Sequence, residues 1–189
     1  MIRLRLAFAA ALAGALCLPQ VAAARPSSSG VYAEAGLGAA ALVGNAGQYS
    51  QAGFSADLRV GYDVFSWLAI GGRLGIQNHR ARVPPPPERE YYQVYVATAE
   101  ARISIPIGAI ALFFDGGVGM SAMSTNVLAK VDVLDPGERA SIRFAGGGGI
   151  EYQLQNRHLA LGLGGEAALM PAFAGAVSTG GRLYLRYTY

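Results

Sequence analysis

Apolar and polar residues alternate with a period of two along most of this chain. In the segment 54–62, Phe54 and Leu58 belong to an apolar face, whereas Asp57 and Arg59 belong to a polar one. Similar patterns occupy the segments 31–38, 68–77, 95–105, 110–120, 141–154, 159–166 and 182–189. Such alternation is typical of strands with one face toward an apolar environment, so the sequence predicts an all-β protein with about eight strands of about ten residues each.

The connections between these segments alternate between short and long. Short ones fall near 63–65, 106–108 and 155–157, and longer ones cover 42–51, 79–90, 123–138 and 170–178. An even number of strands with short turns at one end and long loops at the other is typical of an up-and-down antiparallel transmembrane β-barrel. We expect this barrel to occupy residues 31–189, because closure leaves no open strand edge in lipid.

Two apolar stretches could be mistaken for membrane-spanning helices. The first, 103–114, contains Pro106, and the second, 159–177, contains four glycines, Glu166 and Pro171. Neither supplies the roughly twenty uninterrupted apolar residues that a spanning helix needs. The 26 glycines spread along the chain also disfavour long helices. The sequence therefore disfavours a helical membrane protein.

The charges on the polar face help to decide which face of the barrel points inward. A soluble, lipocalin-like barrel with an apolar interior is the alternative, but its water-facing surface would carry more lysine than the single Lys130 of this chain. Glycine, alanine and serine separate the charges, as the narrow interior of an eight-stranded barrel requires. We therefore predict a structural network of paired charges inside the barrel: Glu34, Asp57, Arg59, Arg73, Glu100, Arg102, Asp115, Arg143, Glu151, Glu166, Arg182 and Arg186.

Aromatic residues collect near the ends of the predicted strands. Those expected toward the short-turn end are Tyr32, Tyr62, Phe65, Trp67, Phe114, Tyr152, Tyr187 and Tyr189, and those expected toward the long-loop end are Tyr91 and Tyr95. Two aromatic girdles at the membrane interfaces are typical of outer-membrane barrels, so this distribution favours an apolar surface that faces lipid.

The first 24 residues have the layout of a secretory signal peptide for export through the Sec pathway. Arg3 and Arg5 precede an apolar run at 6–18, and small residues at 21–24 allow cleavage after Ala23 or Ala24. The alternative, an N-terminal membrane anchor, would need a longer apolar run. Cleavage would remove the one cysteine, and residues 25–30 would form a flexible lead-in.

The composition agrees with a membrane barrel. Charged residues make up only 14% of the chain, against about a quarter in soluble domains, and 52% of the residues are hydrophobic. These values exclude a disordered chain. Loss of Arg3 and Arg5 lowers the formal net charge of +3 by two units, so the charge does not indicate a nucleic-acid partner.

The alternating segments and the last strand resemble the small eight-stranded outer-membrane barrels of Gram-negative bacteria, of the OmpA/OmpX kind. The segment 181–189 resembles the C-terminal signal that the barrel-assembly machinery recognises, carried here by Leu183, Leu185, Tyr187 and Tyr189. The resemblance implies an outer-membrane location and contacts with membrane lipid, lipopolysaccharide, periplasmic chaperones and the assembly machinery. Because the sequence ends at Tyr189, we expect no peptidoglycan-binding domain of the kind found in longer relatives.

Some barrels of this class modify lipid A, so a catalytic function has to be considered. The deacylase type carries a His-x-Ser pair, but here His79 and His158 are followed two residues later by Ala81 and Ala160. His79 is expected at the start of a long loop and His158 at a strand start near a short turn. No cluster has the spacing of a metal site, and we expect no cofactor and no enzymatic activity.

The long loops are the remaining candidates for function. The four prolines at 84–87 should form a stiff polyproline II segment that could bind a surface partner or lipopolysaccharide phosphates; its flanking charges are Arg80, Arg82, Glu88, Arg89 and Glu90. The alternative is a solvated, protease-resistant loop without a partner. We therefore expect a non-enzymatic outer-membrane protein with a structural or surface-interaction role. A narrow, porin-like channel for small or apolar solutes and a lipid A-modifying enzyme remain the alternatives.

Overall fold

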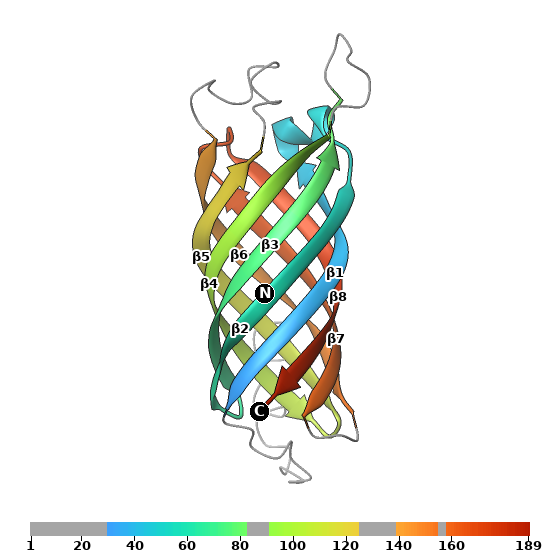
Figure 1. Ribbon diagram of the computed structural model, residues 1–189, viewed down its shortest axis with the longest axis vertical. Coiled ribbons are helices and arrows are strands. Elements are labelled where there is room, and N and C mark those ends of the chain that lie inside the picture. Colours follow the sequence, from blue (N-terminus) through green and yellow to red (C-terminus); the bar gives the residue numbers. More distant parts are fainter. Residues whose placement is uncertain (1–29, 83–90, 125–138, 155–157) are drawn as a thin grey trace, which may run out of the picture.

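The chain folds into a closed barrel of eight antiparallel strands (Figure 1). The computed structural model describes residues 30–82, 91–124, 139–154 and 158–189. The strands are β1 (Val31–Val43), β2 (Gly53–Phe65), β3 (Leu68–Arg80), β4 (Tyr91–Ile107), β5 (Ile110–Met123), β6 (Ala140–Gln153), β7 (Leu159–Met170) and β8 (Ala176–Thr188). The predicted signal peptide and the four prolines at 84–87 lie outside the described residues.

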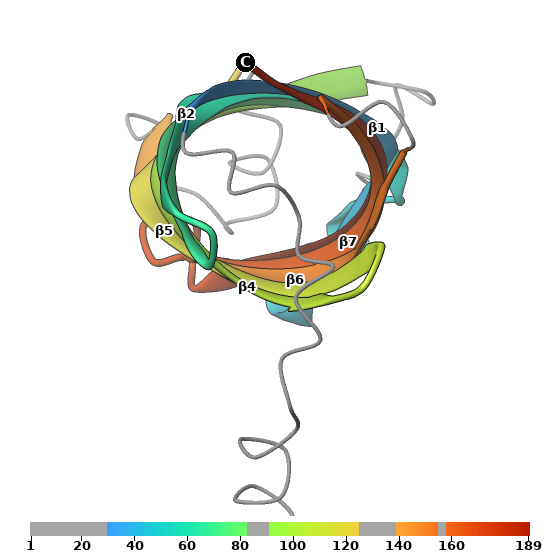
Figure 2. The same cartoon turned by 90° about the horizontal axis from the view of Figure 1, so that it is seen from below.

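Each strand pairs with its neighbours in chain order, and the first and last strands close the ring. β1 pairs with β2 along one edge and with β8 along the other, with Glu34 opposite Arg59 and Arg186. Figure 2 shows the resulting ring from below. The prediction of an up-and-down, all-β barrel is confirmed.

The alternation in the sequence becomes the two faces of the barrel wall. Along β8, Leu183, Leu185 and Tyr187 are exposed on the outside, and the residues between them are buried in the lumen. Large apolar side chains such as Leu58 and Leu74 are more than 60% exposed. An outer surface of this kind is stable in lipid and not in water.

The strand connections define two ends of the barrel. At the turn end, two-residue connections at 66–67 and 108–109 join β2 to β3 and β4 to β5. At the loop end, a 3₁₀ helix (Gly44–Tyr49) lies between β1 and β2. The last connection there is shorter than predicted, because β7 continues to Met170 and β8 begins at Ala176. Only residues 171–175 remain between these two strands, instead of 170–178.

Buried apolar side chains fill the lumen near the loop end. We call this cluster the apolar plug; its members are Leu42, Ala46, Ala81, Tyr92, Val94, Val96, Met123, Met170, Phe173 and Ala176. Ala46 comes from the 3₁₀ helix, and Phe173 comes from the β7–β8 connection. Two loop-end connections therefore fold inward and close this part of the lumen. Within the described residues, the structure contains no helix long and apolar enough to cross a membrane.

Candidate functional site

The most distinctive chemistry of this barrel lies in its lumen, to which every strand contributes charged side chains. β1 supplies Glu34, β2 supplies Asp57 and Arg59, β3 supplies Arg73, and β4 supplies Glu100 and Arg102. The other strands supply Asp115, Arg143, Glu151, Glu166, Arg182 and Arg186. Because successive strand residues point to opposite faces, polar residues at every second position are brought together in the lumen. Eleven of the twelve residues named from the sequence are linked by ion pairs in the lumen, and Arg186 lies apart from them at the turn end.

Arg59 and Arg102 form the centre of this charge network. Arg59 lies 2.9 Å from Asp115 and 3.1 Å from Glu100. Arg102 lies 3.1 Å from Glu34 and 3.5 Å from Glu151. Each arginine thus contacts carboxylates from several strands, which ties opposite walls of the barrel together.

The network continues toward the loop end through three further arginines. Arg182 contacts Asp57 at 2.9 Å and Glu34 at 2.6 Å. Arg73 contacts Asp57 at 3.3 Å and also pairs with Glu166, which accepts a second hydrogen bond from Arg143. Glu166 therefore links the guanidinium groups of Arg73 and Arg143.

A separate ion pair at the turn end includes a residue that the sequence analysis missed. Arg186 pairs with Asp63, which was assigned to a turn but is part of β2. Asp63 is separated from Asp57 and Arg59 by even numbers of residues and therefore lies on the same face of β2. This spacing in the sequence indicated that its side chain points into the lumen. The Arg186 guanidinium also lies 3.9 Å from the ring centroid of Tyr32, a favourable cation–π arrangement.

Tyr32 corrects the predicted aromatic girdle. Its side chain is only 5% exposed and points into the lumen, whereas Tyr62, Phe65 and Trp67 are exposed on the outside as expected. Tyr32 lies two residues before the inward-facing Glu34 in β1, so both side chains point to the same face of the strand. Tyr32 therefore belongs to the interior and not to the membrane interface.

Two other aromatic rings fill the lumen beside the charges. The guanidinium of Arg102 lies 4.4 Å from the ring centroid of Phe113, and that of Arg182 lies 4.5 Å from the centroid of Tyr184. The Tyr184 hydroxyl donates a hydrogen bond of 3.0 Å to Glu151. These rings occupy much of the space that an open channel would need.

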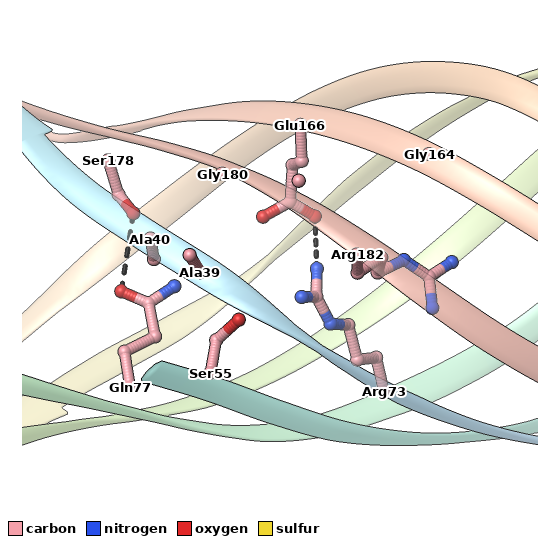
Figure 3. A pocket seen from close by; sticks show the side chains of 11 residues that line it. Ala39, Ala40, Ser55, Arg73, Gln77, Gly164, Glu166, Ser178, Gly180 and Arg182 are labelled. Atoms are coloured by element: carbon pink, nitrogen blue, oxygen red, sulfur yellow. Dashed lines mark hydrogen bonds and ion pairs between the residues drawn. The ribbon is translucent and has the colours of Figure 1, made fainter. Parts of the chain in front are cut away.

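A small polar chamber lies beside the charge network, which contributes Arg73, Glu166 and Arg182 to its lining (Figure 3). Its lining includes Ser55, Arg73, Gln77, Glu166 and Ser178, and the Ser178 hydroxyl donates to the Gln77 amide oxygen at 3.2 Å. The chamber volume of about 20 Å³ can hold about one water molecule. It is too small for a nutrient-sized solute.

The two histidines occupy structural positions. His79 does not open a loop as predicted but belongs to β3 and is fully buried in the lumen, because β3 extends to Arg80. Its Nδ1 lies 3.1 Å from the Gln51 carbonyl oxygen, and its ring stacks on Tyr92. His158 lies at the turn end, where its Nδ1 is 2.7 Å from the Thr188 carbonyl oxygen.

The residues of the predicted assembly signal lie together on the outside of β8. Leu183, Leu185, Tyr187 and Tyr189 are all exposed, and the rings of Tyr187 and Tyr189 meet edge to face with centroids 4.8 Å apart. Among the residues that the structure describes, no group of three or more histidine, cysteine or acidic side chains could hold a metal ion.

Comparisons with known proteins agree with this architecture. Residues 8–180 match the family described as outer membrane protein beta-barrel domain. The search of curated proteins gave no match. Among solved structures, Neisserial surface protein A is 16% identical with a TM-score of 0.63, and the alignment covers 85% of this chain and 98% of that one.

Two further solved structures are from Pseudomonas aeruginosa. The outer membrane protein OprG is 12% identical with a TM-score of 0.59, and the alignment covers 88% of this chain and 99% of that one. The N-terminal β-barrel domain of OprF is 8% identical with a TM-score of 0.53, at coverages of 86% and 99%. At these identities the likeness concerns the fold.

Proposed function

Because this chain belongs to the outer membrane protein beta-barrel domain family, we propose that it is a non-enzymatic barrel of the bacterial outer membrane with a structural or surface-interaction role. The family and the structural neighbours imply the outer-membrane location. The observation that carries the proposed role is the filled lumen. With the interior occupied by structural contacts, the loop end remains as the part of the barrel available to partners.

The lumen contacts argue against the alternative of a channel. The charge network crosses the barrel between β1, β4 and β6 through the contacts of Arg102 with Glu34 and Glu151. Nearer the loop end, the apolar plug includes the fully buried side chains of Tyr92, Met170 and Phe173. A solute would have to displace paired charges and then an apolar cluster, both at considerable cost in free energy.

The histidine environments argue against the alternative of a lipid A-modifying enzyme. A nucleophilic mechanism needs a base within hydrogen-bond reach of a hydroxyl or thiol. The two ring nitrogens of His79 instead lie near the Gln51 carbonyl oxygen and, at 3.4 Å, the Gln77 amide oxygen. Both of these groups are hydrogen-bond acceptors.

We propose that the loop end of the barrel faces the outside of the cell and that the long connections predicted from the sequence at 79–90 and 123–138 carry the surface interaction. Short turns face the periplasm in barrels of this kind, which supports this orientation. Lipopolysaccharide is the proposed lipid partner, and the exposed side chains of β8 are the proposed contact with the assembly machinery.

A peptide tag inserted at 125–138 should be labelled by antibody on intact cells. Labelling only after the outer membrane is permeabilised would contradict this orientation.

Five measurements test the rest of the proposal. The protein should fractionate with the outer membrane and migrate faster on gels before heating than after, whereas a soluble periplasmic protein would contradict the assignment. In planar bilayers we expect no steady conductance, and the lipid A mass spectrum should be unchanged by expression of the protein. N-terminal sequencing of the mature protein should show Arg25, or Ala24 if cleavage occurs one residue earlier.

A further inference from the structure

The outward face of β3, β4 and β5 changes from apolar to polar near the loop end. On β3 the exposed apolar residue Ile76 is followed, at the next outward position, by exposed Asn78. On β4 the change occurs between Tyr95 and Gln93, and beyond β5 Ser124 continues the polar row. These three neighbouring strands therefore leave the apolar region at a common level.

Three polar side chains at this level are joined to one another. Ser124 donates a hydrogen bond of 2.7 Å to the Gln93 amide oxygen, and its hydroxyl accepts one of 3.0 Å from the Gln93 backbone N–H. The Gln93 amide nitrogen lies 3.5 Å from the Asn78 side-chain oxygen. Together with Arg80 and Arg82, these residues form what we call the loop-end polar patch.

The two arginines give the patch its charge. Arg80 has the outward parity of Asn78, opposite to that of the buried His79. Arg82 follows the buried Ala81 and is exposed, and its backbone N–H donates a hydrogen bond of 2.7 Å to the Tyr49 carbonyl. The 3₁₀ helix between β1 and β2 thus holds the Arg82 backbone in place.

No carboxylate of the described segments neutralises these cations. The described acidic residues are Glu34, Asp57, Asp63, Glu100, Asp115, Glu151 and Glu166, and they take part in the charge network or the Asp63–Arg186 pair in the lumen. Among the described residues, the outer face therefore carries positive charge at the level where the apolar surface ends. Tyr91 and Tyr95, exposed on β4, mark the same level as a membrane interface.

We propose that the loop-end polar patch binds the phosphate groups of lipopolysaccharide in the outer leaflet. Arginine guanidinium groups bind phosphate oxygens with two parallel hydrogen bonds, and the amides and hydroxyl beside them offer polar contacts to the adjoining sugar. The inference rests on the proposed outer-membrane location and adds a defined lipid site to it. The lipid would bind along one side of the barrel, over β3 to β5.

The test compares lipid stabilisation of folded protein in detergent micelles. The midpoint of thermal unfolding, read from heat-modifiable gel migration, is measured with lipopolysaccharide, with phosphatidylglycerol and with inorganic phosphate. Lipopolysaccharide should raise the midpoint, because a ligand that binds the folded state stabilises it. The double variant Arg80→Gln, Arg82→Gln should lose most of this shift, and Arg80→Lys, Arg82→Lys should retain part of it.

Arg139→Gln is the matched control. Arg139 is exposed at the same end of the barrel, but its spacing from Ser141 and Arg143 places it on the inward face and not on the proposed lipid site. It should keep the full shift. An equal shift for the double glutamine variant, or an equal arginine-dependent shift with phosphatidylglycerol or inorganic phosphate, would overturn the proposed site. Because folded protein is present in every sample, such a result is distinct from failure to reach the outer membrane.

Discussion

Individual residues in the lumen differ in how many buried charges their ion pairs compensate. Arg143 is fully buried, and its Nε and Nη1 atoms have no hydrogen-bond partner within the described part of the barrel. Its Nη2 donates to Glu166, which also accepts from Arg73. The charges of two buried arginines are therefore compensated in part by one carboxylate. Asp63, in contrast, pairs with Arg186 alone among the described contacts.

This difference predicts unequal effects of neutralising the two acids. Glu166→Gln should lower the free energy of unfolding by about 3–5 kcal/mol, because it leaves buried guanidinium charge uncompensated. Asp63→Asn should cost less, since Arg186 lies at the turn end and keeps its contact with the Tyr32 ring. Urea titration of the two variants in the same detergent gives the comparison. Equal losses would mean that Glu166 has no special role in the network.

Glycines on the two faces of the wall should also respond differently. A Cβ at the inward Gly119 would lie 2.6 Å from the Thr98 Cα, whereas one at the outward Gly116 would find its nearest atom at 3.9 Å. Gly119→Ala should therefore destabilise the barrel by about 1–3 kcal/mol, as overpacking does. Gly116→Ala should change stability by less than about 0.5 kcal/mol. The same urea titration measures both, and a similar loss for the two would contradict the clash.

At the scale of elements, the period of two was enough to predict the strands and the face of most residues. It placed Asp57, Arg59 and Arg182 correctly on one face, because a strand has only two faces. The errors occurred at strand ends, where His79 and Asp63 were assigned to connections. Strand length depends on pairing with a neighbour and on contacts inside the lumen, and neither is visible in a local pattern. Tyr32 was misassigned because an aromatic residue near a strand end suits the interface as well as the lumen.

The β7–β8 connection is the element least accessible to sequence reasoning. It places Phe173 in the apolar plug, and this path requires positive φ angles of 50° at Ala174 and 69° at Gly175. A side chain makes such a conformation unfavourable, whereas glycine adopts it without a steric penalty. The sequence offers glycine at only one of the two positions.

Substitutions in this connection should therefore have opposite signs. Ala174→Gly should be neutral or raise the free energy of unfolding by up to about 1 kcal/mol, and Gly175→Ala should lower it by about 1 kcal/mol or more. The two variants differ by one methyl group at adjacent positions, so each serves as the control for the other. Stabilisation by Gly175→Ala would show that the connection does not keep this conformation in solution.

For the whole molecule, the charge network and the apolar plug are two barriers in series along the lumen. The network spans the middle of the barrel through Arg59 and its contacts with Glu34, Glu100 and Asp115. The plug closes the loop end around Phe173. An ion crossing the barrel must pass both barriers. If one barrier is removed, the other still blocks the ion.

We therefore expect Phe173→Ala and Arg59→Ala, each alone, to remain without steady conductance in planar bilayers. The double variant should conduct small cations, because loss of the Arg59 guanidinium leaves carboxylates unpaired along the path and these attract cations. Heat-modifiable migration of each variant confirms that it is folded before the measurement. Conductance by Phe173→Ala alone would show that the network is permeable as it stands, and the channel alternative would then replace the structural role. A silent, folded double variant would mean that neighbouring side chains fill the space left by both substitutions.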